Sequence, residues 1–158
     1  FLKYANAGDW DKSFFHRSLT DFVVQGGGFN LDENNFVDTV DQGSKITNEP
    51  GISNTRGTIA MAKLSNQPNS ATNQWFFNVG DNSGNLDNQN GGFTVFGKIV
   101  AGRSVIDDVN DLNTVDAGGA FSDLPVTDPD AELGINIDRT TDLVMVWRIA
   151  VLMRIRAV

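Results

Sequence analysis

Short apolar runs separated by polar turns are the main pattern along this chain. Runs rich in aromatic and β-branched residues, bounded by Gly, Asn or Asp, are typical of β-strands. Five such runs occupy residues 13–18, 21–26, 57–62, 74–79 and 93–100. The polar stretches between them, above all 30–53 and 80–92, predict irregular loops. Many short strands with few helices predict a mainly β fold, either a barrel or a sandwich.

The two ends of the chain carry different signals. Residues 1–8 predict the last turns of a helix, with Gly8 as its terminator, but no capping residue precedes them. We therefore expect this element to begin upstream of Phe1. Residues 102–112 have helical spacing and predict a short helix, whereas 116–142 are acidic and loop-like. The run at 143–152 predicts a last strand that is apolar, and hence buried, on both faces.

Composition then excludes several kinds of chemistry. The 158 residues contain no Cys and one His, which removes a thiol nucleophile, a disulfide framework and a metal site built from several His or Cys. We expect no cofactor. The 12 Lys and Arg against 20 Asp and Glu give a net charge of −8, which disfavours binding to nucleic acid. The most apolar stretch, 143–158, is interrupted by three arginines and predicts no membrane helix.

Two loops suggest ligand sites and fail on detail. The glycines at 26–28 would need a further glycine at position 31 to form a dinucleotide loop, and Leu31 stands there. A bend in a strand explains them better. The loop 81–88 is rich in oxygen ligands but has Leu86 where a calcium loop needs its invariant glycine. An isolated leucine in a polar loop is expected to pack inward or to line a pocket.

Arg17 is the most informative charged residue. It lies in an aromatic run, with Phe22 and Gln25 on the next predicted strand. Arginine is almost never buried without a partner, so we expect it to be held by Gln25 or a carboxylate, or to line a cleft. A structural ion pair and a functional role remain equal alternatives on these facts. For His16, a hydrogen-bonded structural role is the simpler interpretation.

These residues also resemble a known family. The sequence FFHRS at 14–18 followed by FVVQGG at 22–27 resembles the signature of cyclophilins, the peptidyl-prolyl cis-trans isomerases. Three further blocks agree in order and spacing, namely GTIAMA at 57–62, QWFFNV at 74–79 and FTVFGK at 93–98. The agreement is close from residue 1 to about residue 105 and looser beyond, and its details look bacterial.

The resemblance implies an eight-stranded antiparallel β-barrel, closed or nearly closed, with two flanking helices and an active site in a groove outside the barrel. Arg17 would be the catalytic arginine, Gln25 would orient it, and the backbone of Ala62 and Lys63 would pair with the peptide. His16 would be structural. The residues expected to contact substrate are Phe22, Gln25, Ala62, Lys63, Gln74, Phe76, Leu86 and Phe93, of which Phe22, Phe76 and Leu86 would form the proline pocket.

The implied function is non-covalent isomerisation of X–Pro bonds in peptides and folding proteins, by a monomer in a bacterial cytoplasm or periplasm. A proline-peptide binding or chaperone module with little catalysis is the alternative. A calcium-stabilised β domain is a third hypothesis. Many eukaryotic members have tryptophan at the position of Asn85 and histidine at that of Phe93. The missing tryptophan argues against cyclosporin binding.

The resemblance also bears on the domain boundaries. We expect one isomerase domain at 1–152, lacking the first strands of the family, and a tail at 153–158. Without those strands, the last strand would lack its usual partner and expose an apolar edge.

Overall fold

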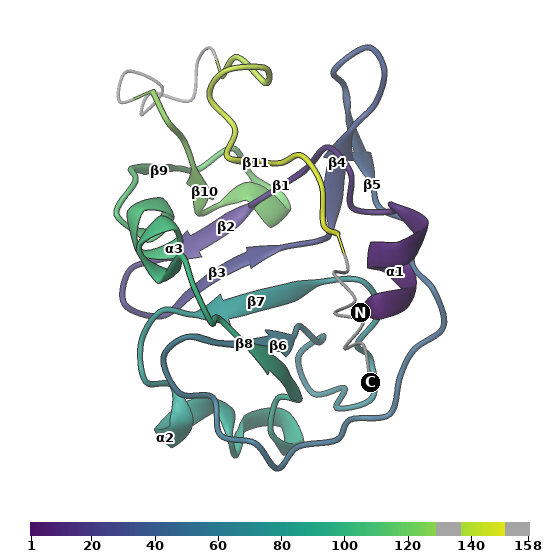
Figure 1. Ribbon diagram of the computed structural model, residues 1–158, viewed down its shortest axis with the longest axis vertical. Helices are drawn as coiled ribbons and strands as arrows, with labels where there is room; N and C mark the ends of the chain where they lie inside the picture. Colours follow the sequence, from purple (N-terminus) through teal and green to yellow (C-terminus); the bar gives the residue numbers. More distant parts are fainter. Residues whose placement is uncertain (129–136, 151–158) are drawn as a thin grey trace, which may run out of the picture.

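The computed structural model describes residues 1–128 and 137–150 (Figure 1). Its helices are α1 (Leu2–Ala7), α2 (Ser83–Leu86) and α3 (Arg103–Asn110), with 3-10 turns η1 (Gln89–Gly91) and η2 (Gly119–Phe121). Its strands are β1 (Ser13–Phe14), β2 (Arg17–Leu19), β3 (Val23–Gly26), β4 (Phe29–Leu31), β5 (Val37–Thr39), β6 (Thr58–Met61), β7 (Trp75–Asn78), β8 (Val95–Lys98), β9 (Thr114–Val115), β10 (Leu124–Pro125) and β11 (Met145–Val146). The fold is therefore mainly β with three helices, as the apolar pattern predicts.

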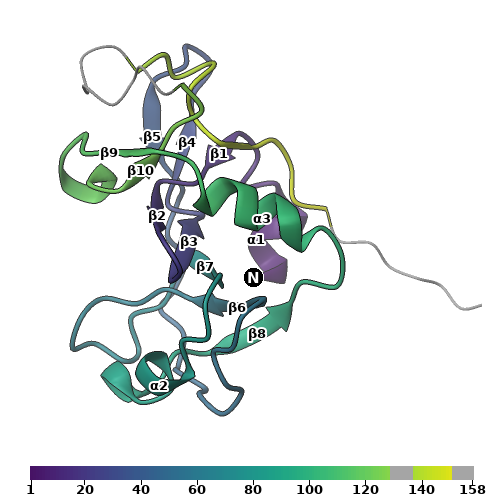
Figure 2. The same cartoon turned by 90° about the vertical axis from the view of Figure 1, so that its left-hand side faces the viewer.

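The strands pair antiparallel in three sheets. A five-stranded sheet has the order β2-β3-β7-β6-β8, a four-stranded sheet has the order β11-β1-β4-β5, and β9 pairs with β10. Figure 2 shows α1 and α3 on the same side of the central strands, and α2 at the end of the molecule away from β4 and β5. The predicted closed eight-stranded barrel is not confirmed, because the strands of the described residues form open sheets with edges.

The main core is built from tryptophans and phenylalanines. Trp10 and Trp75 are buried with their rings edge-to-face at 6.0 Å, and Phe15 meets Trp75 at 5.8 Å. Helix α1 lies on this core, where Tyr4 stacks on Trp10 at 5.1 Å. Gly8 ends α1 in the left-handed conformation, with φ of 76°, which is the terminator that the sequence predicts.

A second, smaller core is separate from the main one. Phe14 packs there with Leu31, Leu124 and Leu143, while its neighbour Phe15 points into the main core. Adjacent residues thus serve two cores, as expected where successive side chains of an extended segment point to opposite faces.

The triple glycine has the structural role that the pattern predicts. Gly27 has φ of 81°, and a Cβ there would lie 2.7 Å from the Asn73 carbonyl oxygen and 2.6 Å from Trp75 Nε1. Only glycine adopts this conformation at such close approach without strain. The turn leads the chain from β3 into β4.

Two strand pairs lie where the sequence predicts loops. The stretch 30–53 contains most of the β4–β5 hairpin, and the stretch 116–142 contains β10. Strands β5 and β10 are short, and the β4–β5 turn is held by Asp32, whose carboxylate accepts the Asn34 and Phe36 amides at 2.8 Å each. Strands of two or three residues within a polar stretch are too short for an alternating apolar pattern to reveal them.

The last strand differs from the prediction. Only Met145–Val146 forms β11, at the edge of its sheet beside β1, and Trp147 is 69% exposed. Burial on both faces is therefore wrong, since Met145 and Val146, whose side chains point to opposite faces, are each only half-buried. Residues 151–152 of that predicted strand and the predicted tail at 153–158 lie outside the described residues. No helix in the described part of the chain is long and apolar enough to cross a bilayer.

Candidate active site

Strand register brings the predicted arginine to the predicted groove. Arg17 is paired with Gln25 across β2 and β3, and Gln25 is paired with Phe76 across β3 and β7. Arg17 Nη1 donates to Gln25 Oε1 at 3.5 Å, and Gln25 Nε2 donates to Gln74 Oε1 at 2.8 Å. On its other side, Arg17 Nε lies 3.4 Å from Asp123 Oδ2. The guanidinium is thus held by both an amide and a carboxylate, at the edge of a pocket.

The pocket beside Arg17 has a volume of about 230 Å³. Its lining includes most of the residues that the resemblance implies, namely Arg17, Phe22, Gln25, Ala62, Lys63, Phe76, Leu86 and Phe93, together with Val23 and Gln89. Two basic residues, Arg17 and Lys63, therefore share this pocket with a largely apolar wall.

The apolar wall is a small core of its own. Phe76 and Leu86 are each 4% exposed and pack with Ala60 and Val95. The Phe76 and Phe93 rings meet edge-to-face at 5.8 Å. Leu86, the isolated leucine of a polar loop, therefore both packs inward and lines a pocket, the two fates predicted for it.

A buried network of amide side chains holds the loop that carries Leu86. Asn82 Nδ2 donates to the Phe22 carbonyl at 2.8 Å and to Asn78 Oδ1 at 2.7 Å, and the Leu86 amide donates to the Asn82 carbonyl at 2.8 Å. Asn54 continues the network, receiving Asn78 Nδ2 at 3.3 Å. Because buried polar groups are costly when left unpaired, this network fixes one wall of the pocket.

Asp87 is bonded to the same network through Asn54. Its carboxylate accepts the Ser53 hydroxyl at 2.6 Å and the Asn54 backbone amide at 2.8 Å. The Ser53 hydroxyl, followed by the backbone and side-chain amides of Asn54, lowers the pKa of the Asp87 carboxyl. The oxygen-rich loop 81–88 therefore uses this carboxylate for structure. Across the described residues, no group of three or more His, Asp or Glu side chains is placed to hold a metal ion.

Lys63 lines the pocket and contacts the loop that follows α2. Its ammonium donates to the carbonyls of Asn90 at 2.9 Å and Gly92 at 2.5 Å, and lies 4.5 Å from the centre of the Phe93 ring. Partial burial lowers the pKa of Lys63. The side chain thereby ties the end of β6 to the loop that follows α2.

Gln74 and His16 are not part of the lining of this pocket. Gln74 lines a neighbouring cavity of about 250 Å³ that shares Gln25, Ala62 and Lys63 with the first. His16 is 2% exposed, its ring is edge-to-face with Phe29 at 4.9 Å, and its Nδ1 has no hydrogen-bond partner within residues 1–128 and 137–150. Burial, followed by the Arg17 charge, lowers the pKa of His16 to about 4, while the Gln74 side chain opposes the shift.

Asp123 is the partner of the candidate arginine that sequence reasoning missed. Its side chain contacts Arg17, and its carbonyl accepts the Ser18 amide at 2.8 Å. It is separated from Arg17 by 106 positions, and one acidic residue among 20 carries no mark of that contact. The earlier expectation that Arg17 is held by Gln25 or by a carboxylate is met by both partners.

Comparisons with known proteins identify the family of this chain. Residues 1–130 match the family model described as cyclophilin type peptidyl-prolyl cis-trans isomerase/CLD. A peptidyl-prolyl cis-trans isomerase of Acinetobacter baylyi is 40% identical over 117 residues, covering 72% of this chain and 60% of the relative. Peptidyl-prolyl cis-trans isomerase B of Escherichia coli is 36% identical over 139 residues, covering 81% and 78%.

The fold has a solved counterpart as well. A Cryptosporidium parvum cyclophilin type isomerase, solved in the presence of the dipeptide Ala-Pro, superposes with a TM-score of 0.64 at 18% identity, covering 98% of this chain and 83% of that one. The chain spans about three fifths of the length of the Acinetobacter relative and of the Dickeya dadantii isomerase A, at 60% and 61%. The chain belongs to the cyclophilin-type peptidyl-prolyl cis-trans isomerase family.

Proposed function

We propose that this chain catalyses cis–trans isomerisation of X–Pro bonds in peptides and folding proteins, with Arg17 as the catalytic residue. The observation that carries the proposal is a guanidinium at the rim of an apolar pocket: Arg17 is about one third exposed and paired with Asp123, and no Asp or Glu of the described residues lines the pocket. The names of the bacterial relatives and of the structure solved with Ala-Pro support the same substrate class.

The reaction asks for little chemistry. The peptide C–N bond has partial double-bond character, with a rotation barrier of about 18–20 kcal/mol. Twisting the bond localises a lone pair on the prolyl nitrogen. A guanidinium directed at that nitrogen stabilises the twisted state more than the planar one, and this difference lowers the barrier. Neither a nucleophile nor a metal takes part.

The pocket supplies the grip. The proline ring is held against Phe22, Phe76 and Leu86 while the chain beside it rotates, and the exclusion of water strengthens the contacts of Arg17. The Ala62 amide is already bonded to the Gln74 carbonyl at 3.0 Å. Pairing with the peptide backbone is therefore assigned to the Ala62 carbonyl and to the Lys63 backbone.

An isomerisation assay on an Ala-Pro peptide, followed by NMR exchange or protease coupling, tests the proposal. We expect Arg17→Ala to lower kcat/KM by about 100-fold to 1,000-fold, the range seen when one transition-state donor is removed. Arg56→Ala is the matched control, because Arg56 also pairs with a carboxylate, at 2.7 Å from Asp107, but does not line the pocket.

The outcomes separate the hypotheses. Arg17→Ala with undiminished activity would remove the assigned mechanism. Peptide binding by the wild type without rate enhancement would favour the binding or chaperone module instead.

A further inference from the structure

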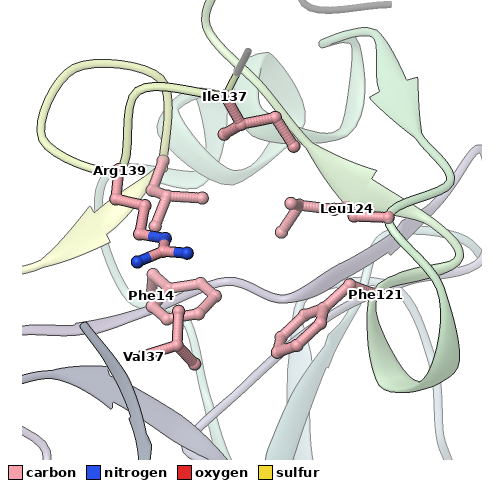
Figure 3. A pocket seen from close by; sticks show the side chains of 8 residues that line it. Phe14, Val37, Phe121, Leu124, Ile137 and Arg139 are labelled. Atoms are coloured by element: carbon pink, nitrogen blue, oxygen red, sulfur yellow. The ribbon is translucent and has the colours of Figure 1, made fainter. Parts of the chain in front are cut away.

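A second cavity lies away from Arg17, against the smaller core. It has a volume of about 360 Å³. Figure 3 shows the side chains of Phe14, Val37, Phe121, Leu124 and Ile137 arranged around it, with the Arg139 guanidinium at its edge. These residues come from β1, β5, η2, β10 and the segment before β11, so no single sequence motif encodes the cavity.

The buried side of the cavity is formed by closely packed apolar side chains. Phe14 is 1% exposed and Leu124 is 4% exposed, and both belong to the smaller core. The rings of Phe14 and Phe121 stack at 6.0 Å. Close-packed side chains of this kind do not move readily into an adjoining hollow, so the cavity is suited to an apolar ligand.

Arg139 adds one charge to this apolar lining. Within the described residues, the salt bridges involve Arg17 and Arg56 and not Arg139. Arg139 instead lies over the Phe36 ring, with 5.7 Å between the guanidinium carbon and the ring centre. Its neighbour Asp138 instead accepts the Thr140 amide and hydroxyl, at 2.9 and 2.6 Å. The N–H groups of the Arg139 guanidinium are therefore available to bind an anion.

Four other carboxylates adjoin lining positions and have partners of their own: Asp123 pairs with Arg17, and Asp142 accepts the Asp138 amide at 2.7 Å. Asp38, beside Val37, accepts the Thr39 amide at 2.7 Å, and Asp116, beside Ala117, accepts the Gly118 amide at 2.9 Å. Among residues that line the cavity, Arg139 is the one charged side chain of the described chain. An apolar hollow with a cation at its rim is complementary to an apolar body that carries one negative charge.

We propose that this cavity binds a small amphipathic carboxylate, its apolar body against Phe14 and Leu124 and its carboxylate on Arg139. A cavity of about 150 Å³ holds benzene, so by proportion this one takes a body of roughly fourteen non-hydrogen atoms. The site is independent of the isomerase proposal, because it shares no residue with the pocket beside Arg17.

Octanoate is a suitable probe, followed by chemical-shift changes in two-dimensional NMR of the full chain. We expect the shifts to gather at Phe121, Leu124 and Ile137, with 1-octanol binding more weakly and octylamine most weakly. Equal affinity for octanoate and octylamine would overturn the assignment of a carboxylate. Shifts confined to residues outside the lining would overturn the site.

Two variants test the cavity and its charge separately. Ala117 is exposed at the mouth, so Ala117→Trp is expected to block the cavity without disturbing the core and to abolish octanoate binding. Arg139→Gln is expected to weaken it roughly fivefold, the upper end for an exposed ion pair. Arg148→Gln is the matched control, an exposed arginine on the same segment that does not line the cavity.

Each variant also has an outcome that contradicts the proposal. Octanoate binding retained by a folded Ala117→Trp protein would place the ligand elsewhere. Equal losses in Arg139→Gln and Arg148→Gln would reduce the charge effect to general electrostatics of the chain.

Discussion

The two apolar hollows of this protein are built differently. The pocket beside Arg17 is lined from neighbouring strands of one sheet and from a loop fixed by the Asn82 network, and several polar groups converge on it. The cavity beside Arg139 is lined from five separate segments and has one charge at its rim. Strand pairing sets the relative positions of groups to within a fraction of an ångström, which catalysis needs and simple binding does not.

The difference also shows in how each arginine is held. Arg17 has an amide and a carboxylate as partners, whereas Arg139 lies over an aromatic ring. A guanidinium held from two sides keeps one orientation, which the proposed role of Arg17 requires. A guanidinium without an ion pair keeps its capacity to bind an anion.

The largest expected effect concerns His16, which lies between the two regions, with Phe29 on one side and Arg17 on the other. Its pKa is about 4 in the folded protein, against an ordinary value of 6.5 for histidine. The unfolded chain therefore binds more protons between these values, and the free energy of unfolding falls as pH falls through this window. The total loss is about 3 kcal/mol, of which roughly 2 kcal/mol is reached by pH 5.

Urea denaturation at pH 7 and at pH 5 measures this loss, and His16→Leu is the comparison. Carboxylates contribute equally to both proteins, so the difference between their pH dependences isolates the histidine, which is the chain's single one. Parallel curves for the two proteins would contradict the depressed pKa.

The next effect concerns the network that only the Arg17 pocket has. Asn82→Ala leaves the Phe22 carbonyl and Asn78 Oδ1 without their donor, and we expect a loss of about 2 kcal/mol in the free energy of unfolding. Because Leu86 is held through the same residue, KM for an Ala-Pro peptide should rise while octanoate binding stays unchanged. An equal change at both sites would show that the two regions are not independent.

A matched pair of phenylalanines compares the hollows directly. Phe76→Leu and Phe14→Leu each remove part of a buried ring, and we expect similar losses of stability, roughly 1 kcal/mol each, as for other large hydrophobic exchanges with repacking. Their functional effects should separate: Phe76→Leu weakens proline-peptide turnover, and Phe14→Leu weakens octanoate binding. Isomerisation assays and NMR titrations on both variants check that each substitution affects one site and not the other.

The smallest effect is expected from Lys63. Lys63→Met keeps the length of the side chain but removes the contacts with the Asn90 and Gly92 carbonyls and with the Phe93 ring. A partly exposed cation–π contact is worth about 0.5–1 kcal/mol, so KM should rise a few-fold with kcat unchanged. Leu64→Met, at an exposed neighbouring position, is the control. A fall in kcat alone would instead assign Lys63 to the chemical step.

Local signals in the sequence predicted much of the fold. The strand runs at 21–26, 57–62 and 74–79 contain β3, β6 and β7. The helical spacing of Val105, Ile106 and Val109 corresponds to α3, and Gly8 ends α1. The β4–β5 hairpin and β10 were missed. These strands have two or three residues each, too few for a periodic apolar pattern to mark them, although Leu124 and Pro125 of β10 are buried.

The sequence by itself also determined the kind of chemistry. With no Cys and one His, and with Arg17 inside a family signature, it left an arginine beside aromatic residues as the candidate, and eight of the predicted residues do line one pocket. Tertiary structure alone decided that Asp123 meets Arg17, that the sheets are open where a closed barrel was expected, and that Arg139 stands over an apolar cavity. The physical reason is that periodicity reports which face of an element is buried, whereas contacts between distant segments depend on how sheets pack and carry no local mark.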